Sequence, residues 1–116
     1  MEEFKETVNE FISLVQQFKF VDAVDKFYAK DIISTDNSNE PVKGFEQFRK
    51  GVENFVANTE LEKLELLSTI VERDLSVIHW HYIFTNKTFG RLDYKQISVQ
   101  RWKLGKIIHE NHFYNL

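Results

Sequence analysis

Apolar side chains in the first half of the chain recur every three or four residues, the spacing of one helix face. This period predicts three amphipathic helices, over residues 3–18, 20–29 and 45–56. Gly44 stands where the N-cap of the third helix should be. Between the second and third helices, residues 34–43 read STDNSNEPVK, a composition typical of a solvated loop. The N-terminal half is therefore expected to be largely helical.

In the second half the apolar period changes to two, the spacing of a β-strand. The pattern predicts strands over residues 61–72 and 75–86, followed by a hairpin within residues 94–114 that turns at Gly105. A further short strand is expected to begin at Ile32. Helices followed by a four-strand antiparallel meander indicate the α+β class.

One face of each hairpin strand mixes polar side chains with aromatic ones, whereas a plain core face would carry Val, Ile and Leu. Such a mixed face suits a pocket with apolar walls and a few polar groups. The same alternation also fits a face that is exposed to solvent, and the pattern alone leaves both interpretations open. The side chains of this face are Gln96, Ser98, Gln100, Trp102, Glu110, His112 and Tyr114.

Composition limits the class of protein more than it indicates a function. A chain of 116 residues is expected to form one domain, residues 1–116, and its eleven Phe predict an aromatic core. The net charge of −3, with signs intermixed, argues against nucleic acid or an anionic membrane as partner. The absence of Cys excludes disulfides and thiol chemistry. No signal-peptide pattern and no membrane-length apolar run is present, so a cytoplasmic protein is expected.

Several short segments follow one another in a distinctive order. They are Phe27-Tyr28-Ala29-Lys30-Asp31, Asp36, Pro41-Val42-Lys43-Gly44, Trp80, and Arg101-Trp102 with Gly105-Lys106-Ile107. In order and spacing they resemble the SnoaL-like and ketosteroid-isomerase-like branch of the nuclear transport factor 2 superfamily. The resemblance implies a cystatin-like, cone-shaped barrel, in which three N-terminal helices pack in the concavity of a curved, mostly antiparallel sheet. It also implies an interior pocket and, as in many such proteins, a dimer through the outer sheet face.

The resemblance assigns the two faces of the sheet. Inward-facing side chains would line one hydrophobic pocket for a small hydrophobic or carbonyl-bearing ligand, and outward-facing ones would form a homodimer surface. The expected inward set is Tyr28, Ile78, Trp80, Tyr82, Gln96, Ser98, Gln100, Trp102, Ile108, Glu110, His112 and Tyr114. The expected outward set is Val77, His79, His81, Ile83, Ile97, Val99 and Arg101.

Three residues are candidates for acid–base chemistry. In isomerase-like members, an Asp at the place of Asp36 is the base that moves a proton beside a carbonyl; the alternative is a loop residue that forms a turn. Polyketide-cyclase-like members use an acid on the last strand, which Glu110 or His112 would supply here. His112 suits a proton shuttle near neutral pH, and Glu110 would orient it or titrate itself. The structural alternatives are a hydrogen-bonded His112, and a Glu110 that is either exposed on the strand or paired with a Lys or Arg.

Other signatures of the family are missing. The isomerase oxyanion hole needs a Tyr on the first helix and an acid on the third long strand, where this chain has Phe11, Ile12 and Ser98. The Asp–Arg–Asp set of the epoxide hydrolases is absent as well. His79-x-His81 is spaced like a pair of metal ligands, but a place in the dimer interface is favoured, and no metal or organic cofactor is expected.

Two functional hypotheses follow. The first is a small-molecule-binding domain that acts as a cofactor-independent general acid–base enzyme of isomerase, cyclase or lyase type. The second is a non-catalytic ligand sensor, or an interaction module that uses the outer sheet face. The missing oxyanion-hole groups favour the second hypothesis.

Overall fold

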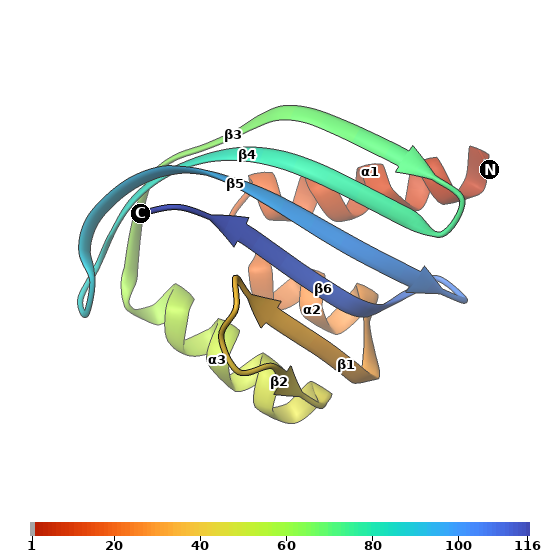
Figure 1. Cartoon of the computed structure of the whole chain (residues 1–116), viewed down its shortest axis with the longest axis horizontal. Coiled ribbons are helices and arrows are strands. Elements are labelled where there is room, and N and C mark those ends of the chain that lie inside the picture. The colour runs from red at the N-terminus through yellow and green to blue at the C-terminus, as the bar shows by residue number, and fades with distance from the viewer. Residues whose placement is uncertain (1) are drawn as a thin grey trace.

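The computed structural model describes residues 2–116 and has the α+β architecture expected from the sequence. Figure 1 shows three helices packed against the concave side of a strongly curved sheet. The sheet has six strands in the order β2-β1-β6-β5-β4-β3 and stays open, because β2 and β3 form separate edges. Every neighbouring pair is antiparallel except β1 and β6, which are parallel. The helices are α1 (Glu2–Gln16), α2 (Phe20–Phe27) and α3 (Phe45–Ala57), and the strands are β1 (Tyr28–Asp36), β2 (Val42–Lys43), β3 (Thr59–Glu72), β4 (Leu75–Asn86), β5 (Gly90–Lys103) and β6 (Lys106–Tyr114).

The first two helices form because each has a continuous apolar stripe to bury against the sheet. In α1 the buried stripe is Val8, Phe11, Ile12 and Val15. The chain leaves α1 through Phe18, whose φ of 60° is left-handed, and α2 begins two residues later. A non-glycine residue in this conformation ends the helix without the Gly or Pro that usually marks such a break.

The segment after α2 differs from the sequence-based expectation. Tyr28 begins strand β1 rather than ending the second helix, and Asp36 ends that strand rather than lying in a loop. Pairing explains the difference, because β1 forms a parallel ladder with β6 that places Asp36 opposite His112. Residues 28–36 therefore join the sheet through a partner about 80 positions away in sequence, which local periodicity cannot reveal.

Irregular pairing bends the strands around the helices. Register shifts interrupt the β3–β4 ladder twice and the β5–β6 ladder once, between Arg101 and Trp102. A bulge adds local twist and bends its strand. It also changes which side chain faces inward, so that Ile107 is fully buried in place of the expected Ile108, which is only half-buried.

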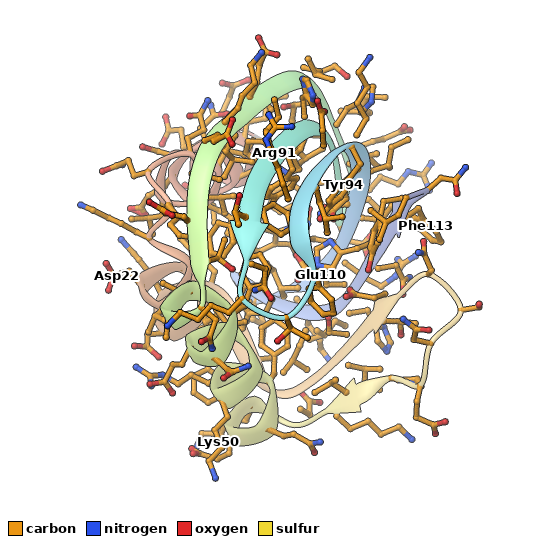
Figure 2. The ribbon with its side chains drawn as sticks, turned by 90° about the vertical axis from the view of Figure 1, so that its left-hand side faces the viewer. Asp22, Lys50, Arg91, Tyr94, Glu110 and Phe113 are labelled. Carbon is orange, nitrogen blue, oxygen red and sulfur yellow. The ribbon has the colours of Figure 1, made fainter. Side chains whose placement is uncertain are left out.

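Side chains at the centre and at the rim of the molecule lie in very different surroundings. Glu110 lies in the interior of the molecule, whereas Asp22, Lys50 and Phe113 lie at its periphery (Figure 2).

None of the helices in the described part of the chain has the length and apolar character needed to cross a membrane.

Candidate functional site

A cavity of about 860 Å³ lies between the concave face of the sheet and the helices. Exposed residues among those that line it, including Asp36, Glu40, Phe89 and Leu116, place its mouth near the end of β1 and the β4–β5 turn. The residues singled out from the sequence that line this cavity are Tyr28, Asp36, Trp80, Tyr82, Gln96, Ser98, Gln100, Glu110, His112 and Tyr114.

Trp102, like Ile78 and Ile108 of the expected inward set, does not line the cavity. Its ring makes edge-to-face contacts with Phe4, Phe11 and Phe27 at centroid distances of 5.6–5.9 Å. The β5–β6 bulge begins at this residue, and the side chain packs between α1 and the end of α2. Trp102 therefore belongs to the aromatic core that supports the site from behind.

Glu110 stands at the centre of a buried hydrogen-bond network on the cavity wall. The Tyr28 hydroxyl lies 2.7 Å from both carboxylate oxygens, and Gln100 Nε2 donates to Oε2 at 2.8 Å. Burial and then the negative charge of Glu110 raise the pKa of Tyr28, so this hydroxyl keeps its proton and donates it. Burial alone would raise the pKa of Glu110, but the charge and hydrogen bond of His112, followed by the hydrogen bonds from Gln100 and Tyr28, lower it below its ordinary value.

His112 completes an ion pair with Glu110. Its Nε2 lies 3.2 Å from Glu110 Oε1, and the side-chain exposures are 22% and 3% respectively. Burial alone would lower the pKa of His112, but the charge and hydrogen bond of Glu110, followed by the charge of Asp36, raise it above the ordinary value. The pair therefore favours a carboxylate and an imidazolium held next to the cavity.

The other imidazole nitrogen of His112 is hydrogen-bonded to Ser98. Nδ1 lies 2.8 Å from Ser98 Oγ, and Gln96 Nε2 lies 3.0 Å from the same hydroxyl. When His112 is charged, Nδ1–H and the Gln96 amide both donate to Ser98 Oγ, because neither can accept. Among residues 2–116 no further partner of this hydroxyl is present, so its own proton is left for a molecule in the cavity. When His112 is neutral, Ser98 donates to Nδ1 instead.

A second chain of hydrogen bonds orients Gln100 behind the site. Trp102 Nε1 donates to Ser76 Oγ at 2.9 Å, and Ser76 donates to Gln100 Oε1 at 2.7 Å. An indole N–H can only donate, so the Ser76 proton points to Gln100 and the Gln100 amide nitrogen faces Glu110. Ser76 is not among the residues predicted from the sequence, although it shares the inward parity of Ile78 and Trp80 on β4.

Asp36 lies at the mouth, on the strand next to His112. The two residues are direct register partners across β1 and β6, so their side chains are neighbours on one face. Burial, then the charge of Asp36 and a hydrogen bond to it, raise the pKa of Tyr114. Asp36 is thus electrostatically coupled to the cavity wall, although it is exposed.

Aromatic side chains that sequence analysis did not assign to the pocket also line the cavity. Tyr94 stacks on Tyr82 with ring centroids 5.8 Å apart, and Phe48 stacks on Tyr28 at 4.8 Å. Tyr94 has the same parity on β5 as Gln96 and Ser98, so the signal was present in the alternation. Phe48 gave no such signal, because its position depends on how α3 packs against β1.

The histidines of the outer face form a different arrangement. His81 Nε2 lies 2.7 Å from Asp93 Oδ1, and Nδ1 lies 3.8 Å from Glu65 Oε1. Burial of the His79 and His81 side chains is only partial. Within the described chain, no group of three or more His, Cys, Asp or Glu side chains is placed to hold a metal ion.

Comparison of the sequence with known families identifies the family to which this architecture corresponds. The profile of the SnoaL-like domain matches residues 8–110. The chain belongs to the SnoaL-like family. This result confirms the resemblance seen in the order of the short segments and agrees with the observed fold, whereas a comparison with curated proteins gives no significant match.

Solved structures share the fold of this SnoaL-like domain at low sequence identity. A candidate SnoaL-like polyketide cyclase (carbohydrate phosphatase) from Mesorhizobium loti has a TM-score of 0.87 at 23% identity, over 96% of this chain and 98% of that one. An NTF2-like protein of unknown function from Burkholderia pseudomallei has a TM-score of 0.81 at 15% identity, over 99% and 92% of the two chains. A LEH-like epoxide hydrolase from M. tuberculosis has a TM-score of 0.77 at 12% identity, over 95% and 80%. At such identities the similarity concerns the fold.

Proposed function

We propose that this domain binds a small, largely apolar carbonyl compound in the cavity and transfers protons at the carbon next to the carbonyl group. The observation that carries the proposal is the buried network Tyr28–Glu110–His112–Ser98, which ends in a hydroxyl on the cavity wall. A buried ion pair is costly to maintain, and perturbed titratable groups in a cavity are a feature of functional sites.

In the proposed reaction, Ser98 and Asp36 are the catalytic residues that touch the substrate. Asp36 takes a proton from the carbon beside the carbonyl, and the C–H electron pair moves to form the enol double bond. The carbonyl oxygen gains the Ser98 proton while Ser98 takes one from His112 Nδ1. Return of a proton from Asp36 to the same or a conjugated carbon, with reversal of the relay, gives exchange or isomerisation.

This arrangement offers a substitute for the oxyanion hole that the sequence lacks. Ser98 occupies the strand position where the isomerases have an acid, and a hydroxyl alone is a weak acid. Here the hydroxyl accepts a hydrogen bond from the imidazolium of His112, which makes it a stronger donor. Glu110 does not touch the substrate in this scheme. It holds the orientation and the charge of His112.

Exchange of protons in D₂O tests the reaction without knowledge of the natural substrate. Small ketones and enones that raise the melting temperature would be incubated with the protein, and loss of the α-proton signal would be followed by NMR. We expect Asp36→Asn to abolish exchange and Ser98→Ala to slow it at least about tenfold, while His79→Gln on the outer face has no effect. Wild-type exchange rates in both site variants would reject the proposal, and binding without exchange would favour a ligand sensor.

We also propose that two copies of the chain associate through the outer sheet face. Ile70, Ile97 and Phe113 are 61%, 42% and 49% exposed there. A groove of about 290 Å³ on the same face is lined in part by Ile33, Leu75 and Val99. Exposed apolar side chains that gather on one face favour burial against a partner. Sedimentation that shows a monomer at micromolar concentration would overturn this proposal.

A further inference from the structure

The charges on the cavity lining are not balanced. Within the described chain the lining contains the carboxylates of Asp36, Glu40 and Glu110, and neither Lys nor Arg. Its one basic side chain, His112, is paired with Glu110. Asp36 and Glu40 take part in no ion pair among residues 2–116. With His112 charged, three carboxylates and one imidazolium leave the lining with a net negative charge, and neither carboxylate at the mouth is held in an ion pair.

Aromatic side chains make up a third of the residues that line the cavity. Tyr82, Tyr94 and Tyr114 come from three adjacent strands, with ring centroids 5.8 Å and 5.0 Å apart. Asp36 lines the same cavity as Tyr94 and Tyr114. Its charge, after burial and, for Tyr94, after the charge of Tyr114, raises the pKa of both hydroxyls. The faces of aromatic rings are electron-rich and attract cations, above all organic ammonium groups that shed water easily.

We propose that the ligand of this cavity is an organic cation, with an ammonium group near the mouth and an apolar body against the rings. The inference rests on the proposed function in that the cavity must first bind a small molecule. It specifies that this molecule is positively charged. It also excludes acids as ligands, because a carboxylate or phosphate near the mouth would face Asp36 and Glu40. The reactive carbonyl end of the same molecule would lie deeper, at Ser98.

Three probe molecules of similar size distinguish the effect of ligand charge on binding from the effect of ligand shape. Benzyltrimethylammonium and neopentylbenzene have the same heavy-atom skeleton and differ by a nitrogen and its positive charge, and phenylacetate supplies a negative charge. Their dissociation constants would be measured by NMR titration of the full chain at low salt and again at high salt. We expect the ammonium compound to bind about tenfold more tightly than the neutral one, with the preference reduced at high salt and phenylacetate not bound.

Variants then test the two mouth carboxylates. Glu40→Gln is the leading change, because Glu40 is exposed and has no part in the proposed proton transfer, and Asp36→Asn with Glu40→Gln removes both charges. We expect the ammonium preference to fall in the single variant and to disappear in the double one. The matched control is Glu72→Gln, an exposed carboxylate on β3 that lies outside the cavity lining.

The outcomes distinguish the two proposals. If neopentylbenzene binds as tightly as benzyltrimethylammonium, the cation inference is overturned and the cavity remains a site for small molecules. If none of the probes binds, and the ketones and enones also fail to bind, the proposed function fails together with the inference. An equal loss of the ammonium preference in Glu72→Gln would show an effect of overall charge and would also overturn the inference.

Discussion

On the concave face of the sheet, Gln96, Ser98, Gln100 and Glu110 are at most 7% exposed. On the convex face of the same strands, Ile97 is 42% exposed and Phe113 is 49% exposed. An ordinary two-layer domain shows the reverse arrangement, with aliphatic side chains towards the helices and polar ones towards solvent. Buried polar groups and exposed apolar groups are the informative exceptions in a folded protein. The concave face also supplies core side chains such as Ile78, Phe84 and Ile107, so the buried polar groups beside them and the exposed apolar groups opposite are what the proposed pocket and the proposed dimer would explain.

The two faces also differ in how firmly their polar groups are fixed. Among residues 2–116, every buried side-chain nitrogen and oxygen has a hydrogen-bond partner. Removal of one partner from such a network leaves others unsatisfied in a medium of low polarity. Ion pairs of the outer face, such as His81 with Asp93, are partly solvated and screened by salt. Mutations of equivalent chemistry should therefore have unequal effects on the two faces.

The largest expected difference comes from one substitution made on each face. Glu110→Gln removes the charge that balances His112 and should lower the free energy of unfolding by about 3 kcal/mol. The matched change is Glu65→Gln on the outer face, where Glu65 Oε1 lies 3.8 Å from His81 Nδ1. It should change the free energy of unfolding by less than about 0.5 kcal/mol. Urea denaturation of both variants at pH 6 measures the contrast. Equal losses would contradict the distinction between the faces.

The ion pair also predicts how stability depends on pH. The folded-state pKa of His112 lies above the ordinary 6.5, so its contribution is complete below pH 6.5 and is lost as pH rises through the raised value. The folded-state pKa of Glu110 lies below the ordinary 4.5, so its contribution is complete above pH 4.5 and is lost as pH falls through the lowered value. Between these limits both groups stabilise the fold.

Denaturation across a pH series tests this window. We expect the free energy of unfolding to fall by about 1.4 kcal/mol for each unit by which the pKa of His112 exceeds its ordinary value, with most of the loss above pH 6.5. His112→Gln should remove the decline at high pH, and His79→Gln on the outer face should leave it in place. A decline of the same size in His112→Gln would assign the pH dependence to other groups.

Alternation along the chain was enough to predict which side chains of the C-terminal hairpin share a face, with the exception of Ile108, whereas the resemblance to the family was needed to decide which face points inward. Period two placed Gln96, Ser98 and Gln100 on one face with Glu110 and His112, and the register pairs Ser98 with His112 and Gln100 with Glu110. The strand over residues 75–86 was predicted with its observed bounds. These features depend on neighbouring strands and on a short turn, so the local pattern contains them.

Features that depend on distant partners were not predictable in the same way. Strand β1 exists because its residues pair with β6 near the other end of the chain. The burial of Ile107 in place of Ile108 depends on a bulge, because the register passes from Arg101–His109 to Trp102–Ile107 and leaves Ile108 without a partner. The hydrogen bond from Tyr28 to Glu110 joins residues 82 positions apart, and no spacing rule connects them.

Ile97→Glu should have the smallest effect on the stability of the monomer and a large effect on dimer formation. The side chain is 42% exposed on the convex face, so the substitution should change the free energy of unfolding of the monomer by less than about 0.5 kcal/mol. In the proposed dimer it would bury a carboxylate in an apolar contact, which strongly opposes association. Sedimentation should therefore show monomers of normal stability. The matched change is Leu104→Glu, at a residue that is 93% exposed in the β5–β6 turn, and it should leave dimer formation intact. An equal loss of dimer in both variants would show that the dimer contact does not lie on the convex face.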